Sequence, residues 1–296
     1  MLRAAGHRVR LTLEWTPDFP ADVLLALHAR RSHASIRAFH AAHPGRPLLV
    51  ALTGTDVYRD IHVSPEAKES LRLADRFIVL QPRAIDELEP RLRRRASVVY
   101  QSCATRLHHQ PVRRGFRICV IGHLRQEKDP LRSLKALAYV PHSAGIEVVQ
   151  LGASLDRAIE CEARAGCARE ARYRWLGSVP HARALAWLAS SHAMVISSRM
   201  EGGANVISEA ARLGVPVLAS FSSGNIGLLG KRYPAYYPLG DERALAALMM
   251  RAAGDEGFYS GLRERMRRLR PLVAPSNEAR LLRAAIKACT GAKERR

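Results

Sequence analysis

Short runs of β-branched and other apolar residues alternate along this chain with longer amphipathic segments of helical length. The alternation is typical of parallel-sheet α/β architecture, because parallel strands are joined by crossovers that are usually helices. The sequence predicts two sets of strands, and each set should form one Rossmann-like sheet. The first set covers residues 9–13, 23–27, 47–52, 76–80 and 97–100, and the second covers 116–121, 146–151, 173–176, 193–197 and 216–219.

The length of 296 residues favours two domains, since typical domains hold about 100 to 200 residues. A polar, proline-containing connector at 103–115 (CATRLHHQPVRRG) separates the two sets of strands. We therefore expect an N-terminal Rossmann-like domain over 1–108, a C-terminal Rossmann-like domain over 109–275, and a C-terminal helix and tail over 276–296.

The start of the chain is unusual for such a domain. Residues 2–5 resemble the last turn of a helix, Gly6 its C-cap, and His7 the start of the next strand. A Rossmann domain begins instead with a strand, a glycine-rich turn and a helix. We expect the N-terminal domain to lack its first strand and most of its first helix, and a clipped, inactive protein is one alternative that this leaves open.

The formal net charge is +20, from 47 Lys and Arg against 27 Asp and Glu. Such a charge by itself favours nucleic acid or an acidic membrane surface as a partner. Most arginines, however, are scattered along helical segments among alanine and leucine, and only 91–95 and 263–270 hold short clusters. We therefore expect small anionic substrates and no nucleic acid. A basic nucleic-acid-binding protein is the alternative from another functional class.

Membrane and metal signals are absent from the sequence. No apolar run reaches the roughly 18 residues of a membrane span, and the N-terminus lacks the apolar core of a secretory signal. We expect no stable membrane insertion and a cytoplasmic location. The five cysteines are an odd number, and Cys161 and Cys167 are too far apart for a CxxC metal hook, so the sequence predicts reduced thiols and no metal site.

The segment 195–220 (VISSRMEGGANVISEAARLGVPVLAS) carries the most chemical information. A strand should end at Ser197, and a helix should cover about 206–214, with its last glycine as the cap. The loop between them lies at the carboxyl edge of the sheet, where open α/β folds bind ligands, and the helix N-terminus attracts an anion such as a diphosphate. Glu201 and Glu209 can then bracket a ligand that has hydroxyls at both ends.

A second segment with strand, glycine turn and helix start lies at 118–130 (ICVIGHLRQEKDP). The strand ends at Gly122, and cationic side chains follow before the next helix. Lys128 supplies a point charge and Arg125 a bidentate fork, and both are groups with which proteins hold phosphate. The alternative is that these two side chains are solvated loop charges.

Glu201, seven further residues and Glu209 resemble the EX7E motif of retaining GT-B glycosyltransferases of the sucrose-synthase and mannosyltransferase group. The surrounding EGGANVISEAARLGVPVLAS resembles their EGFGLVLLEAMALGVPVVAS. The resemblance implies two Rossmann-like domains whose parallel sheets face a cleft, with the nucleotide-sugar donor in the C-terminal domain. It also implies that Glu201 contacts the donor hexose and Glu209 the ribose hydroxyls. The alternative, if the EX7E spacing is a chance match, is that Glu201 is a loop charge and Glu209 an ordinary helix-surface glutamate.

The same resemblance implies contacts for the rest of the donor. The backbone amides of four consecutive residues would face the sugar and the diphosphate: Gly202, Gly203, Ala204 and Asn205. Leu176 and Gly177, in YRWLGS, resemble the end of the strand that contacts the base, which is most often uracil.

The phosphate-binding segment of that family follows the pattern G-R-L-x-x-x-K-G. Gly122 and Lys128 are in register with it, but His123 stands where the arginine belongs and Arg125 follows two residues later. Either of these side chains can replace the arginine. Lys128, Arg125 and Glu201 are the candidate catalytic residues, because catalysis here depends on stabilising the departing diphosphate and orienting the sugar.

Two motifs of the N-terminal half point to an acceptor. LLALHARRSHAS at 24–35 and LTGTDVY at 52–58 both follow predicted strands. His28, Arg31 and His33 could grip a small anion through charge-assisted hydrogen bonds, and Asp56 could contact the sugar or the acceptor. A lone histidine in such a place is more often part of a core or a cap.

These two motifs, together with GHLRQEKDP and SSRMEGGANVISEA, resemble the selenosugar synthases of the selenoneine pathway over nearly the whole chain, from residue 2 to about 271. The resemblance implies that the selenium of selenophosphate attacks C1 of UDP-N-acetylglucosamine or UDP-glucose and that UDP leaves. UDP-sugar and selenophosphate are then substrates, and no cofactor is expected. The alternative within the same fold is a UDP-sugar-dependent enzyme whose acceptor is an alcohol on a lipid or polysaccharide.

Overall fold

The computed structural model describes residues 1–293, and the chain forms two compact units. The first unit holds residues 1–102, 201–203 and the chain from 274 onward, and the second holds 103–200 and 204–273. The C-terminal helix α12 (Pro275–Lys293) therefore belongs to the first unit.

The first unit is built on a four-stranded parallel sheet in the order β1-β2-β3-β4. Leu24 pairs with Leu48, Leu49 with Arg76, and Phe77 with Ala96. The strands are β1 (Leu24–Leu27), β2 (Leu48–Leu52), β3 (Arg76–Val79) and β4 (Ala96–Val98). The helices are α1 (His33–Ala42), α2 (Ile61–Val63), α3 (Pro65–Leu73) and α4 (Pro90–Arg93), with single helical turns η1 (Arg3–Ala5), η2 (Asp56–Asp60) and η3 (Pro82–Ile85).

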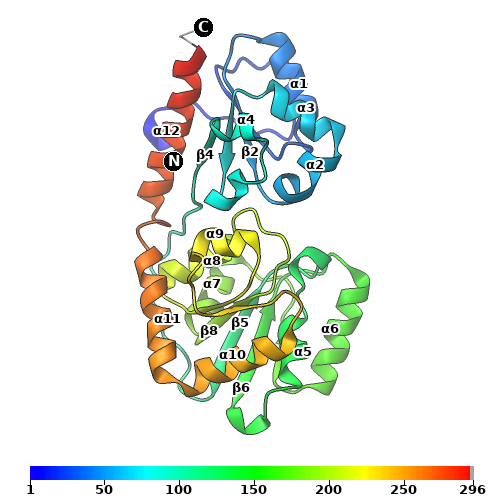
Figure 1. Cartoon of the computed structure of the whole chain (residues 1–296), viewed down its shortest axis with the longest axis vertical. Coiled ribbons are helices and arrows are strands. Elements are labelled where there is room, and N and C mark those ends of the chain that lie inside the picture. The colour runs from blue at the N-terminus through cyan, green and yellow to red at the C-terminus, as the bar shows by residue number, and fades with distance from the viewer. Residues whose placement is uncertain (294–296) are drawn as a thin grey trace. The chain divides into compact units, whose positions relative to one another are not determined.

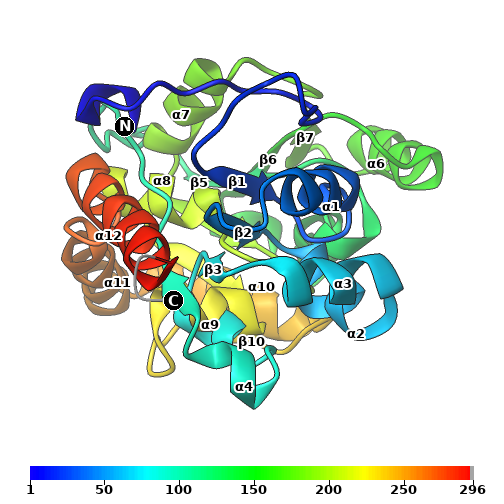
Figure 2. The same ribbon diagram turned by 90° about the horizontal axis from the view of Figure 1, so that it is seen from above.

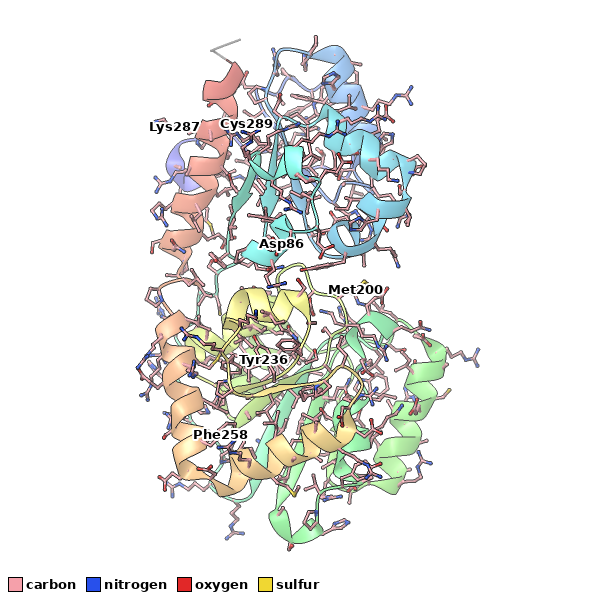
Figure 3. The ribbon with its side chains drawn as sticks, viewed as in Figure 1. Asp86, Met200, Tyr236, Phe258, Lys287 and Cys289 are labelled. Carbon is pink, nitrogen blue, oxygen red and sulfur yellow. The ribbon has the colours of Figure 1, made fainter. Side chains whose placement is uncertain are left out.

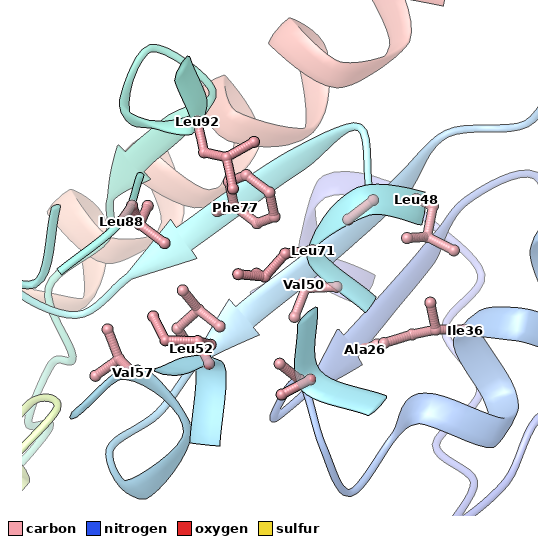
Figure 4. Close-up of a cluster of buried hydrophobic side chains, with 14 of the residues drawn as sticks. Ala26, Ile36, Leu48, Val50, Leu52, Val57, Leu71, Phe77, Leu88 and Leu92 are labelled. Carbon is pink, nitrogen blue, oxygen red and sulfur yellow. The ribbon is translucent and has the colours of Figure 1, made fainter. Parts of the chain in front are cut away.

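Both faces of this sheet are buried, as expected for a parallel sheet. Side chains of β2 alternate between the faces: Leu48, Val50 and Leu52 belong to the larger core cluster, which Figure 4 shows. The helices α1 and α3, which pack side by side (Figure 2), contribute to that cluster. The other face contacts α12, where Cys289 is buried (Figure 3). The C-terminal helix thus closes the second face of the N-terminal sheet.

The second unit holds a six-stranded parallel sheet in the order β10-β9-β8-β5-β6-β7. Figure 1 labels β8, β5 and β6 of this sheet. Counted from its own first strand, this order is 3-2-1-4-5-6, the order of dinucleotide-binding Rossmann folds. The strands are β5 (Phe116–Ile121), β6 (Ile146–Leu151), β7 (Tyr173–Trp175), β8 (Ala193–Ile196), β9 (Val217–Ser220) and β10 (Tyr236–Tyr237). Right-handed crossovers place the helices that follow β5 and β6 on one face and those that follow β7 and β8 on the other.

The helices of this unit pack in two groups. α7 packs against α8 and α8 against α11, while α10 packs against α5. The helices are α5 (Arg132–Leu137), α6 (Arg157–Arg169), α7 (His181–Ala189), α8 (Asn205–Leu213), α9 (Ser223–Leu229), α10 (Glu242–Gly254) and α11 (Glu256–Leu269), with single turns η4 (Gln126–Lys128) and η5 (His142–Ala144).

The predicted α/β class with two parallel sheets is confirmed, but the first predicted strand is wrong. Residues 9–13 form no strand, and Leu11 and Leu13 are exposed. Alternation of apolar and polar residues is a weak signal where no neighbouring strand supplies pairing and burial. The predicted cap is confirmed: Gly6 has φ 88° and its N–H donates to the Arg3 carbonyl. The short β10 was not predicted, since two residues carry no periodicity.

Candidate functional site

The strand order of the second unit locates a ligand crevice. The order reverses between β5 and β8, and open α/β sheets bind ligands outside the carboxyl ends of the strands at such a point. Gly122 follows β5, Ser197 follows β8, and Gly177 lies just after β7. The segments singled out from the sequence therefore meet at one edge of this sheet.

The backbone at this edge is closely packed. Gly152, directly after β6, has φ 143°, and a Cβ on it would lie 2.1 Å from the Gly122 carbonyl oxygen. Its N–H donates to the Gly177 carbonyl at 2.8 Å, and the Gly122 N–H donates to Leu151 at 2.9 Å. The ends of β5, β6 and β7 are thus joined by backbone contacts that only glycine allows at position 152.

His123 is held by the neighbouring loop. The Ala153 N–H donates to His123 Nδ1 at 3.0 Å, so this ring nitrogen is engaged by that loop. The exposed ring stands where the family pattern has an arginine. Arg125, whose guanidinium is half-buried, is the permanent cation of this stretch, and its Nε has no hydrogen-bond partner among the described residues.

The loop that carries Lys128 is fixed by its neighbours. The Ser197 hydroxyl lies 3.0 Å from the Lys128 carbonyl oxygen and 2.8 Å from that of Asp129. Asp129 has the left-handed conformation, with φ 44° and ψ 53°, and its carboxylate accepts from Arg132 Nε at 3.0 Å. Arg132 also pairs with Glu242 at the start of α10. Lys128 therefore sits on a backbone anchored to the end of β8 and to α10.

Helix α8 opens toward this edge with an uncapped N-terminus. Ala204 is its N-cap and supplies no side-chain hydrogen bond, and no acidic residue lies in the first turn. The Ile207 N–H donates to the Ala204 carbonyl at 2.8 Å. The N–H groups of Asn205 and Val206 and the positive end of the helix dipole are therefore those that an anion could meet here. Gly214 ends the helix with φ 86°, as predicted. Glu201, Gly202 and Gly203 lie in the loop before α8, and Glu201 is buried.

Glu209 is not a surface glutamate of α8. It is 3% exposed, and its Oε1 accepts from His181 Nε2 at 2.8 Å and from Asn205 Nδ2 at 3.0 Å. Burial raises the pKa of the Glu209 carboxyl, and the hydrogen bond and charge of His181 act in the opposite direction. The solvated-surface alternative for Glu209 is therefore wrong. His181 was missed from the sequence, because only the packing of α7 on α8 brings it to Glu209.

Leu176 and Gly177 lie at the carboxyl end of β7. The Leu176 N–H donates to Gln150 at 2.9 Å, which fixes its backbone, while its side chain is 36% exposed. Gly177 has φ 68° and no atom within 4 Å of the place of a Cβ. The end of β7 thus carries an exposed apolar side chain beside a glycine with open space around it.

The structure brings the two acceptor motifs of the first unit together. Asp56 is fully buried, and its carboxylate accepts four backbone N–H groups, from Ala29 at 3.1 Å, Thr53 at 2.9 Å, Gly54 at 2.8 Å and Val57 at 3.1 Å. The segment after β1 is thereby tied to the segment after β2. This geometry makes Asp56 an anchor of both segments, and its predicted contact with substrate stays a prediction.

His28 is a buried part of the same network. It has φ 79°, its Nδ1 accepts the Arg31 N–H at 3.3 Å, and its Nε2 lies 3.1 Å from Thr55 Oγ1. Burial lowers the pKa of His28, although Asp56 and Asp60 act in the opposite direction. Both ring nitrogens of His28 are engaged within the protein, and its predicted contact with the acceptor stays a prediction.

His33 and Arg31 differ in how accessible their charges are. His33 Nδ1 lies 3.2 Å from Ser70 Oγ and Nε2 lies 3.2 Å from Glu69 Oε2, so both nitrogens are engaged. The Arg31 side chain is exposed and has no hydrogen-bond or ion-pair partner among residues 1–293. Of the predicted acceptor residues, Arg31 offers the open cationic group.

Two general features of the described residues bear on function. Within 1–293, no helix combines the length and the apolar character that a membrane span needs. In the same range, no three His, Cys, Asp or Glu side chains gather as a metal-binding group.

Comparison with known proteins places the chain among sugar-transferring enzymes. The family model described as "Glycosyl transferases group 1" matches residues 108–268. Anabaena HepE, solved in complex with UDP, is 17% identical, with 90% of this chain and 79% of that chain covered and a TM-score of 0.75. The complex of HepE with UDP-glucose is 15% identical, with 91% of this chain and 79% of that chain covered and a TM-score of 0.73. Sucrose-phosphate synthase from Thermosynechococcus elongatus is 17% identical, with 92% of this chain and 74% of that chain covered and a TM-score of 0.73. At these identities the likeness concerns the fold.

Proposed function

The chain belongs to the group 1 glycosyl transferases, whose family model matches more than half of its residues, and from that premise we propose that it transfers the hexose of a UDP-sugar to selenophosphate. It is a transferase, and its two parallel-sheet α/β units have the fold of GT-B glycosyltransferases. Donor and acceptor are proposed from the residues at the sheet edges.

The buried Glu209 carboxylate is the observation that carries the donor proposal. A buried carboxylate lowers stability unless its oxygens are hydrogen-bonded, and among the described residues only Oε1 of Glu209 has partners. A buried carboxylate with one oxygen left for a ligand, at the edge of the sheet where such folds bind ligands, favours a functional role. Glu209 would accept the ribose hydroxyls and Glu201 the hexose hydroxyls. Leu176 and Gly177 would face the uracil. The complexes of Anabaena HepE with UDP and UDP-glucose support UDP as the nucleotide.

The departing diphosphate would be stabilised by fixed positive groups. As the bond between C1 and the diphosphate oxygen breaks, negative charge grows on that oxygen and positive charge grows at C1. Arg125, Lys128 and the open N–H groups of α8 would stabilise the negative charge. Gly122 leaves room beside the Lys128 side chain, whose Cδ lies 4.0 Å from the place of a Gly122 Cβ. His123 would add a ring nitrogen to these groups.

The acceptor proposal rests on the four segments that resemble selenosugar synthases and on Arg31. Selenium of selenophosphate would form the new bond to C1 while UDP leaves with the electron pair of the broken bond. Selenium is a soft nucleophile that needs little deprotonation, so no dedicated general base is required. The exposed Arg31 guanidinium would bind the phosphate oxygens through a bidentate contact. His28, His33 and Asp56 would hold the segment that carries it.

The test is to incubate the protein with UDP-N-acetylglucosamine or UDP-glucose, each with selenophosphate, phosphate or no acceptor. UDP release is followed by chromatography and selenium-containing sugar by mass spectrometry. The proposal predicts UDP together with a selenosugar only when selenophosphate is present. UDP release without a selenosugar would reject selenium as the acceptor atom and favour an alcohol acceptor, while leaving the UDP-sugar donor in place.

A further inference from the structure

We propose that His181 is a positioning residue of the nucleotide site, which holds the Glu209 carboxylate ionised and in one orientation and so makes nucleotide binding depend on pH. This role rests on the proposed function, because it assumes that Glu209 takes the ribose of the donor. His181 lies on α7, whereas Glu209 lies on α8, so this role adds a residue from a second helix to the proposed nucleotide site.

The geometry separates the two oxygens of Glu209. His181 is the first residue of α7, and its Nε2 lies 2.8 Å from Glu209 Oε1, which also accepts from Asn205 Nδ2 at 3.0 Å. Among the residues that the structure describes, Oε2 has no hydrogen-bond partner. One oxygen is therefore fixed by the protein, and the other is the one that can accept a ribose hydroxyl.

The two side chains of the pair differ in exposure. The His181 side chain is 66% exposed and that of Glu209 is 4% exposed. Solvent therefore reaches the imidazole directly, while the carboxylate that it contacts is buried. Burial raises the pKa of the Glu209 carboxyl, and His181 lowers it through its hydrogen bond and its charge. Without His181, Glu209 should take up a proton at a higher pH.

The other groups near Glu209 do not supply this effect. Cys119 of β5 and Cys103 of the connector both feel the charge of Glu209, and burial raises their pKa values to about 12 and about 11. Both thiols stay uncharged between about pH 6 and 8, since those values lie several units higher. The charge of Arg212 acts on the pKa of Cys103 in the direction opposite to burial. His181 is thus the charged partner that α7 brings to the carboxylate.

The experiment measures the Kd of UDP by calorimetry at pH 6, 7 and 8. His181→Ala removes the partner, and His181→Gln keeps an N–H donor but no charge. Arg183→Ala is the matched control, because Arg183 is an exposed cation two residues along α7. Each Kd is divided by that of the unmodified protein at the same pH, which cancels the ionisation of UDP itself.

We expect the Kd ratio of His181→Ala to be roughly threefold at pH 8 and about tenfold or more at pH 6, the range of a charge-assisted hydrogen bond. His181→Gln should restore binding at pH 8 and fail to restore it at pH 6. Arg183→Ala should stay near a ratio of one at each pH. With UDP-sugar as substrate, His181→Ala should raise KM and leave kcat nearly unchanged.

Three results would overturn this role. A ratio near one for His181→Ala at every pH would show that His181 does not act on nucleotide binding, with the donor site intact. A loss that is the same at every pH, or that Arg183→Ala shares, would show a general structural effect. Absence of UDP binding by the unmodified protein would reject the nucleotide site itself, and this role with it.

Discussion

Asp129 shows how one residue fixes the phosphate-binding loop. It occupies the place of the glycine in the family pattern and adopts the left-handed conformation, with φ 44°. Asp tolerates this conformation better than most residues, because its short polar side chain can bond locally. Here the carboxylate accepts from Arg132 Nε and Nη2 at 3.0 and 3.2 Å. The backbone before it, which includes Lys128, is thereby held in place.

This geometry predicts different effects for two substitutions at position 129. Asp129→Ala and Asp129→Gly remove the same carboxylate, but only glycine adopts a positive φ without steric cost. Asp129→Ala should therefore lower the free energy of unfolding by about 1 kcal/mol more than Asp129→Gly does. Urea denaturation followed by circular dichroism checks this. Equal midpoints for the two variants would show that the left-handed backbone carries no strain.

Single residues differ in how far the sequence could predict them. Glu209 could be proposed as a site residue from the sequence, because its spacing from Glu201 and its helix are local features of the chain. The contacts of His181 and His123 could not be predicted, since they follow from the packing of α7 on α8 and of Ala153 on the loop after β5. Asp56 was predicted as a contact residue, and its four backbone hydrogen bonds depend on two segments that meet only in the fold.

At the scale of elements, three strands end in the same way at the carboxyl edge of the second sheet, where we propose that the donor binds. β5, β6 and β7 are each followed, within two residues, by a glycine: Gly122, Gly152 and Gly177. Each of these glycines follows an apolar residue, and this repetition is a sequence signal that could have identified Gly152, which was not among the predicted site residues. Most strands of the second unit were predictable because they are short apolar runs that the fold buries, whereas the two-residue β10 was missed and 9–13 shows alternation without burial.

Gly152 provides a test at this scale. A Cβ at this position would lie 2.1 Å from the Gly122 carbonyl oxygen and 2.8 Å from the His123 nitrogen, so Gly152→Ala must displace the turn after β5. We expect a lower melting temperature and a weaker UDP affinity by about tenfold or more. Gly254→Ala, at the end of α10 with no atom within 4 Å of the new Cβ, is the control and should leave both unchanged or slightly raise stability. Normal UDP binding by Gly152→Ala would contradict the proposed turn.

For the whole molecule, class and family were predictable, while the acceptor rests on resemblance. The strand order of the second unit is that of a Rossmann-like sheet, and the family match makes the chain a glycosyltransferase. The net charge of +20 favours anionic substrates without naming one. Of the predicted acceptor residues, Arg31 offers the open charge. A guanidinium binds an anionic acceptor but does not select which atom of that acceptor attacks C1. Analysis of the reaction products therefore identifies the attacking atom.

The most direct test of the account is the affinity for UDP of the unmodified protein and of variants at Glu209. We expect the unmodified protein to bind UDP, and Glu209→Ala to weaken binding by about tenfold or more. Glu209→Gln, which keeps the size of the side chain, should also bind more weakly while retaining the circular dichroism spectrum. Glu256→Ala, an exposed glutamate at the start of α11, should bind normally. Unchanged UDP affinity in both Glu209 variants would contradict a donor site built around this buried carboxylate.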